Sequence, residues 1–214
     1  MGKNVIQIEG VAANGSVRTY SLTINRQEKP PADSCFGDIR GHWAEAEVKE
    51  ACALGLFQGG PEDLFRPDSP VTRAEWAVMI ARGLNPDTQS ITPVSGFADA
   101  AGIPAWAREA IASATRSGIL IGYPDGTFRS AVTISRAETV ATLVRAAKWQ
   151  TDPAAATSFA DDASIPSWAK LYAAAAASQG MLRGKAGNRF EPIAPTTRAE
   201  AAAFLVRLSK LSNA

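Results

Sequence analysis

The chain has 214 residues, of which 46% are hydrophobic and 20% charged, with a formal net charge of +1. This composition is typical of a globular protein of one or two domains. So small a net charge gives no general attraction to nucleic acid or acidic membranes, and we expect neither as a partner. No apolar run is long enough to cross a bilayer, so we predict no membrane insertion.

Residues 1–29 carry a strand pattern. Val5–Glu9 and Thr19–Ile24 alternate apolar and polar residues, and Asn14-Gly15 between them favours a hairpin turn. A pair of strands alone is marginal in water. We therefore predict that residues 1–29 are the terminal strands of a truncated upstream β-sandwich, and they resemble the end of cadherin-like bacterial β-sandwich modules. Residues 30–35 read as a linker.

The N-terminal sequence shows no signal peptide, because Met1-Gly2-Lys3 leads directly into the strand pattern. The chain is then either intracellular or a fragment of a longer exported protein. We favour the fragment, because the hairpin needs a partner sheet.

From residue 36 onward, one unit occurs three times. Each copy opens with Phe-x-Asp, at Phe36, Phe97 and Phe159. In each copy a tryptophan is followed, at offsets that are identical in all three, by two glycines, a phenylalanine and an arginine. The residues in these positions are Trp43, Gly55, Gly59, Phe65 and Arg73; Trp106, Gly118, Gly122, Phe128 and Arg136; and Trp168, Gly180, Gly184, Phe190 and Arg198.

This self-similarity predicts a repeat protein. We place the repeats at 36–84, 97–147 and 159–214, with polar linkers at 85–96 and 148–158.

Each repeat reads as helix, loop, helix. We expect the first helix to carry the tryptophan and to end at a left-handed glycine, Gly55, Gly118 or Gly180. The second helix should run to about Leu84, Ala147 or Ser209. A single helical pair cannot bury its own apolar face, so we predict a mainly α domain in which three pairs share one core with pseudo-threefold symmetry.

The second helix of each repeat begins with a capping box, as in Thr72-Arg73-Ala74-Glu75. In this motif the hydroxyl and the glutamate each satisfy a free amide at the helix start. The arginine is not needed for capping, and it opposes the helix dipole at a cost of roughly 0.3–1 kcal/mol. Arg73, Arg136 and Arg198 therefore indicate a further purpose. Contact with an anionic ligand and a salt bridge to the adjacent repeat both remain open, and we favour the ligand.

Several elements in fixed order carry a resemblance to a known family. They are Phe-x-Asp, a helix near tryptophan, the loop Gly122–Phe128 and the Thr-Arg-Ala-Glu helix start. Together they resemble the S-layer homology (SLH) family, over about residues 36–214. Gly59–Asp63 and Gly184–Asn188 depart from the fuller loop, and Ser130-Ala131 stands where the first repeat has Pro-Asp. The grooves between repeats therefore need not be equally competent.

The resemblance implies a function as well as a fold. It implies three repeats acting as an internal pseudo-trimer in a monomeric chain. Their grooves would bind secondary cell-wall polysaccharide through a pyruvylated amino-sugar terminus, anchoring an exported bacterial protein non-covalently at the cell wall. The alternative is a structural assembly module of a surface layer without direct glycan binding. Binding to peptidoglycan itself is a third possibility.

Four sets of repeated residues are candidates for ligand contact. The arginines match a carboxylate, tryptophan offers an apolar face to a sugar ring, aspartate accepts from hydroxyls, and glycine permits close backbone approach. Each set also has a structural alternative. It is a salt bridge for the arginines, a core anchor for the tryptophans, and backbone shape for the glycines. For the aspartates it is a cap on the following helix or a bond that fixes the preceding turn. The candidates are Arg73, Arg136, Arg198, Trp43, Trp106, Trp168, Asp38, Asp99, Asp161, Gly59, Gly122 and Gly184.

Other repeated residues receive structural roles. We assign the repeated phenylalanines to the core. The arginines that close the second helices, Arg82, Arg145 and Arg207, suit a helix C-terminus, and we give them no ligand role.

We predict no enzyme, cofactor or metal site. His42 is the single histidine, which makes a Ser-His-Asp or Cys-His centre improbable, and the motif glutamates are engaged in capping. Asp125 beside Gly126 is not an EF-hand loop, and one histidine with two cysteines is too few ligands for zinc. Cys35 and Cys52 could form a disulfide, although we favour two free thiols.

Overall fold

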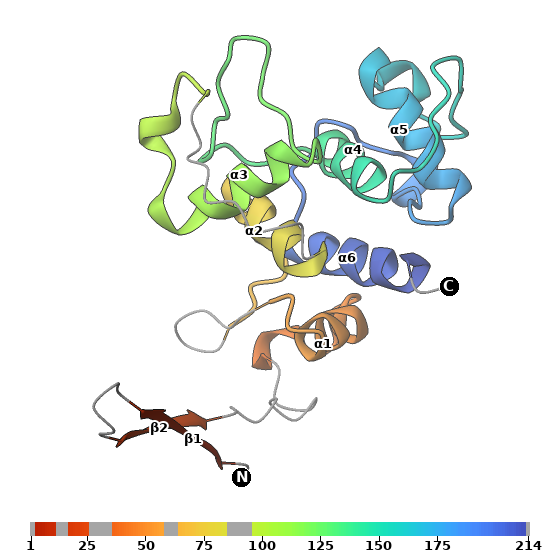
Figure 1. Ribbon diagram of the computed structural model, residues 1–214. Helices are drawn as coiled ribbons and strands as arrows, with labels where there is room; N and C mark the ends of the chain where they lie inside the picture. Colours follow the sequence, from red (N-terminus) through yellow and green to blue (C-terminus); the bar gives the residue numbers. More distant parts are fainter. Residues whose placement is uncertain (1–2, 12–16, 26–35, 58–63, 85–95, 213–214) are drawn as a thin grey trace. The chain divides into compact units, whose positions relative to one another are not determined.

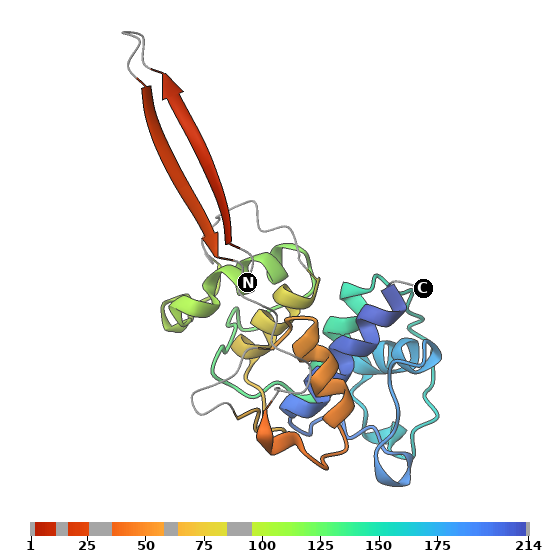
Figure 2. The ribbon, with the colours of Figure 1, turned by 90° about the horizontal axis from the view of Figure 1, so that it is seen from below.

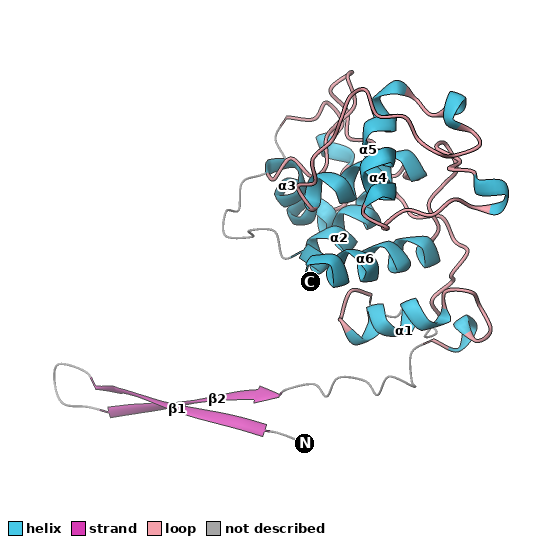
Figure 3. Cartoon of the chain, turned by 90° about the vertical axis from the view of Figure 1, so that its right-hand side faces the viewer, coloured by secondary structure: helices cyan, strands magenta, loops and turns pink. Residues whose placement is uncertain are grey.

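The computed structural model describes residues 3–11, 17–25, 36–57, 64–84 and 96–212, and the chain divides into two compact units, Met1–Pro31 and Ala32–Ala214. The first unit is an antiparallel hairpin of β1 (Lys3–Val11) and β2 (Val17–Asn25), in which Lys3 faces Asn25 and Val11 faces Val17 (Figure 3). The predicted strands are confirmed. The turn at Asn14-Gly15 lies outside the described residues.

The second unit is mainly helical, as predicted (Figure 1). Each repeat supplies two α-helices joined by a loop, and short 3-10 turns precede several of them. Within the described residues, no helix is long and apolar enough to cross a membrane. The helices are α1 (Glu45–Ala53), α2 (Arg73–Leu84), α3 (Arg108–Arg116), α4 (Arg136–Ala146), α5 (Ser167–Ser178) and α6 (Arg198–Ser212).

The first helix of each repeat ends as predicted but does not always begin as predicted. Gly55, Gly118 and Gly180 follow its last turn with φ of 73°, 68° and 68°, the left-handed conformation that glycine adopts without strain. However, Trp43 precedes α1 in a turn closed by the bond from Glu45 N to His42 O (2.9 Å), and Trp106 lies in a 3-10 turn, Ala105–Ala107. Only Trp168 lies within the α-helix itself.

The helices pair between repeats. The first helix of each repeat packs against the second helix of the preceding one: α3 against α2, α5 against α4, and α1 against α6, which closes the ring. Figure 2 shows α1 alongside α6, although they come from opposite ends of the unit. The shared core contains Phe65, Phe128 and Phe190, which are fully buried and pack near the opening phenylalanine of their own repeat. The single core predicted from the sequence is therefore formed by helices of neighbouring repeats that pack on one another.

A closed ring of backbone hydrogen bonds links the segments that precede the second helices. Val71 N donates to Thr196 O, Thr196 N to Ile134 O, and Ile134 N to Val71 O, at 2.9, 3.0 and 2.9 Å. The three residues occupy equivalent positions in the three repeats. This ring is direct evidence for the predicted pseudo-threefold arrangement.

The aspartate of each Phe-x-Asp motif holds the loop of its own repeat. Asp99 accepts hydrogen bonds from Phe128 N and Arg129 N, both at 2.7 Å, with its two carboxylate oxygens. Arg129 has φ of 60°, which is uncommon for a residue with a side chain, so the carboxylate stabilises an unfavourable backbone. Asp38 and Asp161 make the same pair of bonds in their repeats. The aspartates do not cap the next helix, and the turn that they fix is the one that follows the loop, not the preceding turn considered from the sequence.

These bonds also change the acidity of the three aspartates. Burial alone would raise the pKa of the Asp99 carboxyl, but the two backbone N–H donors outweigh burial and hold its pKa below the ordinary value. The pKa values of Asp38 and Asp161 are lowered in the same way.

The first glycine of the loop, Gly122 in the second repeat, is required by close packing rather than by a left-handed backbone. A Cβ on Gly122 would lie 2.5 Å from Phe97 Cε1 and 2.9 Å from Thr127 O. A Cβ on Gly184 would lie 2.8 Å from Asn188 Cα. Gly59, the equivalent glycine of the first repeat, lies outside the described residues.

The favoured assignment of two free thiols is wrong. Cys52 is disulfide-bonded, and Cys35, the only other cysteine of the sequence, lies outside the described residues. The sequence could not decide this point, because spacing alone does not determine whether two cysteines approach each other.

We expect Gly122→Ala to destabilise the fold by about 1–3 kcal/mol, because the new methyl group overlaps the Phe97 ring and the Thr127 carbonyl. Thermal unfolding measures the change. Gly102→Ala is the matched control, since a Cβ there meets no atom within 4 Å. Equal melting temperatures for the two variants would contradict this role for Gly122.

The aspartates also predict a pH dependence of stability. Because the folded-state pKa of Asp99 lies below its ordinary value of 3.8, its contribution is complete above that pH and is lost as pH falls through the folded-state pKa. We therefore expect urea unfolding to show lower stability at about pH 3 than at about pH 7. The loss should be smaller in Asp99→Asn and unchanged in Asp152→Asn, an exposed control. Identical losses in all three proteins would count against the role of Asp99.

Candidate functional site

The three predicted capping boxes are formed, and in each of them one carboxylate oxygen of the glutamate, Oε2, accepts the capping bond. Ser135 accepts from Glu138 N, while Glu138 Oε2 accepts from Ser135 N at 2.8 Å. Thr72 with Glu75 and Thr197 with Glu200 make the same reciprocal bonds. Only one carboxylate oxygen is needed for capping. In Glu138 and Glu200 the other oxygen, Oε1, faces the arginine of the preceding repeat.

Arg73 is buried and bound to the second repeat. Its Nε donates to Phe128 O at 2.8 Å, Nη2 to Ile121 O at 3.0 Å, and Nη1 to Glu138 Oε1 at 3.1 Å. The guanidinium also lies over the Tyr123 and Phe128 rings, at 4.7 and 4.8 Å from their centroids. The salt bridge to the adjacent repeat, one of the two open interpretations of the sequence, is therefore present.

Arg136 and Arg198 occupy equivalent places. Arg136 donates from Nη1 to Glu200 Oε1 at 3.3 Å and from Nη2 to Arg183 O at 2.9 Å. Arg198 closes the ring by donating from Nε to Phe65 O at 2.7 Å. Burial lowers the pKa of both guanidinium groups, but an arginine begins from so high a pKa that both remain charged.

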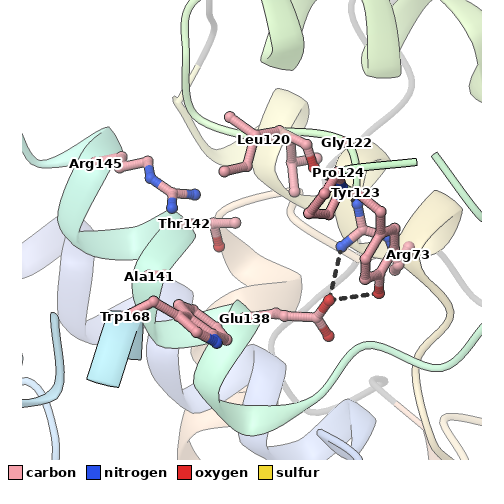
Figure 4. A pocket seen from close by; sticks show the side chains of 11 residues that line it. Arg73, Leu120, Gly122, Tyr123, Pro124, Glu138, Ala141, Thr142, Arg145 and Trp168 are labelled. Atoms are coloured by element: carbon pink, nitrogen blue, oxygen red, sulfur yellow. Dashed lines mark hydrogen bonds and ion pairs between the residues drawn. The ribbon is translucent and has the colours of Figure 1, made fainter. Parts of the chain in front are cut away.

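A first groove lies beside Arg73. We call it the Arg73 groove; it has a volume of about 380 Å³. Arg73 comes from the first repeat, the loop and α4 from the second, and Trp168 from the third. Figure 4 shows Arg73 and Arg145 on opposite sides of this groove, with both Arg73 and Tyr123 bound to Glu138. Its lining residues are Arg73, Leu120, Ile121, Gly122, Tyr123, Pro124, Glu138, Ala141, Thr142, Arg145 and Trp168.

A second groove repeats this plan one repeat further on. The Arg136 groove has a volume of about 430 Å³ and takes Arg136 from the second repeat, the loop and α6 from the third, and Trp43 from the first. Its lining residues are Trp43, Asp68, Arg136, Arg183, Gly184, Lys185, Thr197, Glu200, Ala203, Phe204 and Arg207. Arg198 and Trp106 mark the third junction, whose loop at 58–63 lies outside the described residues.

The repeated tryptophans are not core anchors, contrary to the structural alternative considered from the sequence. Trp43, Trp106 and Trp168 have 59%, 60% and 47% of their surface exposed. The pairing of helices between repeats explains their position. Because α5 packs on α4 and α1 packs on α6, Trp168 and Trp43 lie at the grooves that those second helices form.

The other predicted candidates divide between the grooves and the framework. Gly122 and Gly184 line a groove each, in addition to their packing role. Asp38, Asp99 and Asp161 are not among the residues that line either groove, since their carboxylates are bound to the backbone of their own repeat.

Sequence reasoning missed two groove arginines. Arg145 and Arg207, which we gave no ligand role, line the Arg73 and Arg136 grooves respectively. Their recurrence at a fixed distance from the helix-start arginine was the available signal. Arg145 lies over the Tyr172 ring at 4.7 Å, and its Nε donates to Tyr172 Oη at 3.2 Å.

The grooves share one combination of side chains, in which cations that can pair with an anion lie beside a flat apolar ring. Each combines two or more arginines with one exposed tryptophan. In the part of the chain that the structure describes, no group of three or more His, Cys, Asp or Glu side chains could hold a metal ion.

Comparison with known proteins agrees with this architecture. The S-layer homology domain family matches residues 36–77, 96–140 and 158–202. The chain is 31% identical to an amylopullulanase of Thermoanaerobacterium thermosulfurigenes, over 94% of this chain and 11% of that protein. It is 31% identical to an S-layer protein of Bacillus thuringiensis subsp. finitimus, over 84% of this chain and 22% of that protein.

A third relative is the cellulosome-anchoring protein of Acetivibrio thermocellus, 33% identical over 71% of this chain and 35% of that protein. The chain thus spans about a third or less of the length of these relatives. One of them, the amylopullulanase, is an enzyme by name, whereas the S-layer homology domain that it shares with this chain is an anchoring domain. With three matched repeats that cover more than half of its residues, the chain belongs to the S-layer homology family of bacterial cell-surface anchoring domains.

Proposed function

We propose that this chain anchors the protein that carries it to the cell wall by binding secondary cell-wall polysaccharide in the grooves between its repeats. The ligand we propose is a pyruvylated amino sugar at the end of the polymer. The observation that supports this most strongly is the repeated construction of the two grooves, each with arginines and an exposed tryptophan drawn from different repeats.

The Arg73 groove suits a sugar that carries one carboxylate. An arginine has five N–H donors, and three hydrogen bonds hold Arg73 to the second repeat from Nε, Nη1 and Nη2. The donors that remain on Nη1 and Nη2 can bind a ligand carboxylate, and Arg145 supplies a second cation across the groove. A ketal-linked pyruvate presents a carboxylate beside a methyl group, and Leu120, Ile121 and Pro124 provide apolar contact.

Trp168 and Trp43 suit the sugar ring itself. An exposed indole at the edge of a groove offers a flat apolar face, at little cost to the fold if it is removed. Tryptophan is highly buried on average in folded proteins, and the recurrence of a half-exposed ring at the edge of each groove is easier to explain by binding than by packing.

One observation favours the alternative, an assembly module without glycan binding. The arginines do bridge repeats through Glu138 and Glu200. These bridges lie within one chain, however, and account for the pseudo-trimer rather than for contacts between subunits. Binding to peptidoglycan itself would survive hydrolysis of the pyruvate ketal on the wall polymer, whereas the proposed binding would be lost.

We expect Trp168→Ala to weaken binding of a pyruvylated wall-sugar fragment by roughly tenfold, because an aromatic anchor of a binding site is removed. Trp43→Ala tests the Arg136 groove in the same way, with calorimetry as the measurement. Ile193→Ala is the control, since this side chain is 85% exposed and lines neither groove. If both tryptophan variants bind as the control does, the grooves are not the binding sites.

We also predict that Arg73 both stabilises the fold and binds the ligand. Arg73→Ala leaves the partly buried Glu138 without its ion-pair partner and removes a buried side chain, and we expect a loss of roughly 3–5 kcal/mol in unfolding free energy. Arg40→Ala, at an exposed arginine, should change stability by less than about 0.5 kcal/mol. Urea unfolding measures both variants.

Binding should be compared per folded molecule, with the fraction folded taken from the same unfolding curves. We expect Arg73→Ala to reduce binding per folded molecule by at least about tenfold, because a charged hydrogen bond to the ligand is lost. Lower stability with unchanged binding per folded molecule would leave Arg73 a purely structural residue.

A further inference from the structure

The two grooves share one plan but differ in charge at two of the loop positions that line them. Ile121 and Tyr123 of the Arg73 groove are replaced by Arg183 and Lys185 in the Arg136 groove, at equal offsets from Gly122 and Gly184. We propose, building on the glycan-binding function above, that the Arg136 groove binds a doubly charged group of the wall polymer, a phosphate monoester on an amino sugar. The Arg73 groove would bind the singly charged carboxylate.

The charges that line the grooves support this division. Two arginines and one glutamate line the Arg73 groove, whereas three arginines and a lysine, with one aspartate and one glutamate, line the Arg136 groove. The aspartate, Asp68, is 84% exposed and is held outward by His42, whose Nε2 lies 3.2 Å from Asp68 Oδ1. With all of these charges counted, the lining of the Arg136 groove carries a net charge of +2 and that of the Arg73 groove a net charge of +1.

The partly buried glutamate of each groove, Glu138 or Glu200, has different partners in the two grooves. Glu138 Oε1 accepts from the neutral hydroxyl of Tyr123 at 2.5 Å, so Arg73 alone balances its charge. Glu200 Oε1 is paired with both Arg136 at 3.3 Å and Lys185 at 2.9 Å. Lys185 also pairs with Glu191 Oε2 at 3.3 Å, so Glu200 and Glu191 together balance Arg136 and Lys185. Arg183 and Arg207 add further positive charge to the lining of the groove.

Arg136 also has an unused donor. Arg73 and Arg198 donate from Nε to a phenylalanine carbonyl of the next repeat, at 2.8 and 2.7 Å. Within the described residues, Arg136 Nε is buried without a hydrogen-bond partner, and its guanidinium lies 5.8 Å from the Phe190 ring, where Arg73 and Arg198 lie 4.8 and 4.9 Å from theirs. A buried donor without a partner is costly, so a shift of Arg136 toward a bound anion would break no Nε bond to the framework.

A phosphate monoester matches this set of groups. It carries between one and two negative charges at neutral pH and three strong acceptor oxygens. Lysine contributes a point charge and arginine a planar fork, and both bind phosphate. The aromatic Tyr123 and the apolar Ile121 of the other groove offer no equivalent charge.

The test compares three sugars with the whole chain: a neutral N-acetylhexosamine, its pyruvylated form and its phosphate monoester. Indole N–H signals in two-dimensional NMR report each groove separately, Trp43 for the Arg136 groove and Trp168 for the Arg73 groove. Trp43→Phe and Trp168→Phe assign the two signals. Ionic strength is held constant, because salt screens partly exposed charges.

We expect the phosphate sugar to shift the Trp43 signal at roughly tenfold lower concentration than the Trp168 signal, from two additional charge pairs. The double variant Arg183→Ile with Lys185→Tyr gives the Arg136 groove the residues of the other groove and should abolish this preference. Arg183 is exposed and Lys185 partly exposed, so the variant should fold.

The outcomes separate this inference from the proposed function. Equal concentrations at the two tryptophans, no response to the phosphate sugar, or an unchanged preference in the double variant would overturn the inference. If the pyruvylated sugar then still shifts Trp168, the proposed function stands without it. If instead the phosphate sugar shifts Trp43 while the pyruvylated sugar shifts neither signal, the inference stands and the pyruvate-binding function fails.

Discussion

The architecture depends on one interaction, in which the arginine at the start of a second helix reaches into the next repeat. In the first turn of a helix this charge is unfavourable by roughly 0.3–1 kcal/mol. The cost is offset because Arg73 and Arg136 meet a glutamate of the next repeat and donate to loop carbonyl oxygens. With the backbone ring through Val71, Ile134 and Thr196, these contacts join three similar units into one closed domain.

The same closure creates the grooves. Because each first helix packs on the second helix of the preceding repeat, the exposed tryptophan of a third repeat is brought to a junction formed by the other two. No repeat contains a described groove by itself. Loss of one repeat would therefore remove more than one binding surface, and small loop differences such as Tyr123 against Lys185 can give each junction its own chemistry.

The sequence predicted what local signals determine. Capping boxes, the left-handed Gly55, Gly118 and Gly180, and the buried Phe65, Phe128 and Phe190 depend on residues close in the chain or on apolar repetition. It left open whether Trp43 and Trp168 are exposed ligand contacts or core anchors, and it did not predict the bonds from Phe128 and Arg129 to Asp99. Both depend on partners that are distant in the chain or belong to another repeat, which spacing does not identify. The place of Arg145 in a groove was not predicted either, because that groove exists only between repeats.

The central claim is that the arginines of the grooves recognise the carboxylate of a pyruvylated sugar while holding the repeats together. Calorimetric titration of the chain with a pyruvylated wall-sugar fragment and with its pyruvate-free twin tests it most directly. The account predicts binding of the pyruvylated fragment only. Equal binding of both fragments would contradict it and leave a general sugar-binding domain whose arginines are structural, and binding of neither would favour the assembly module.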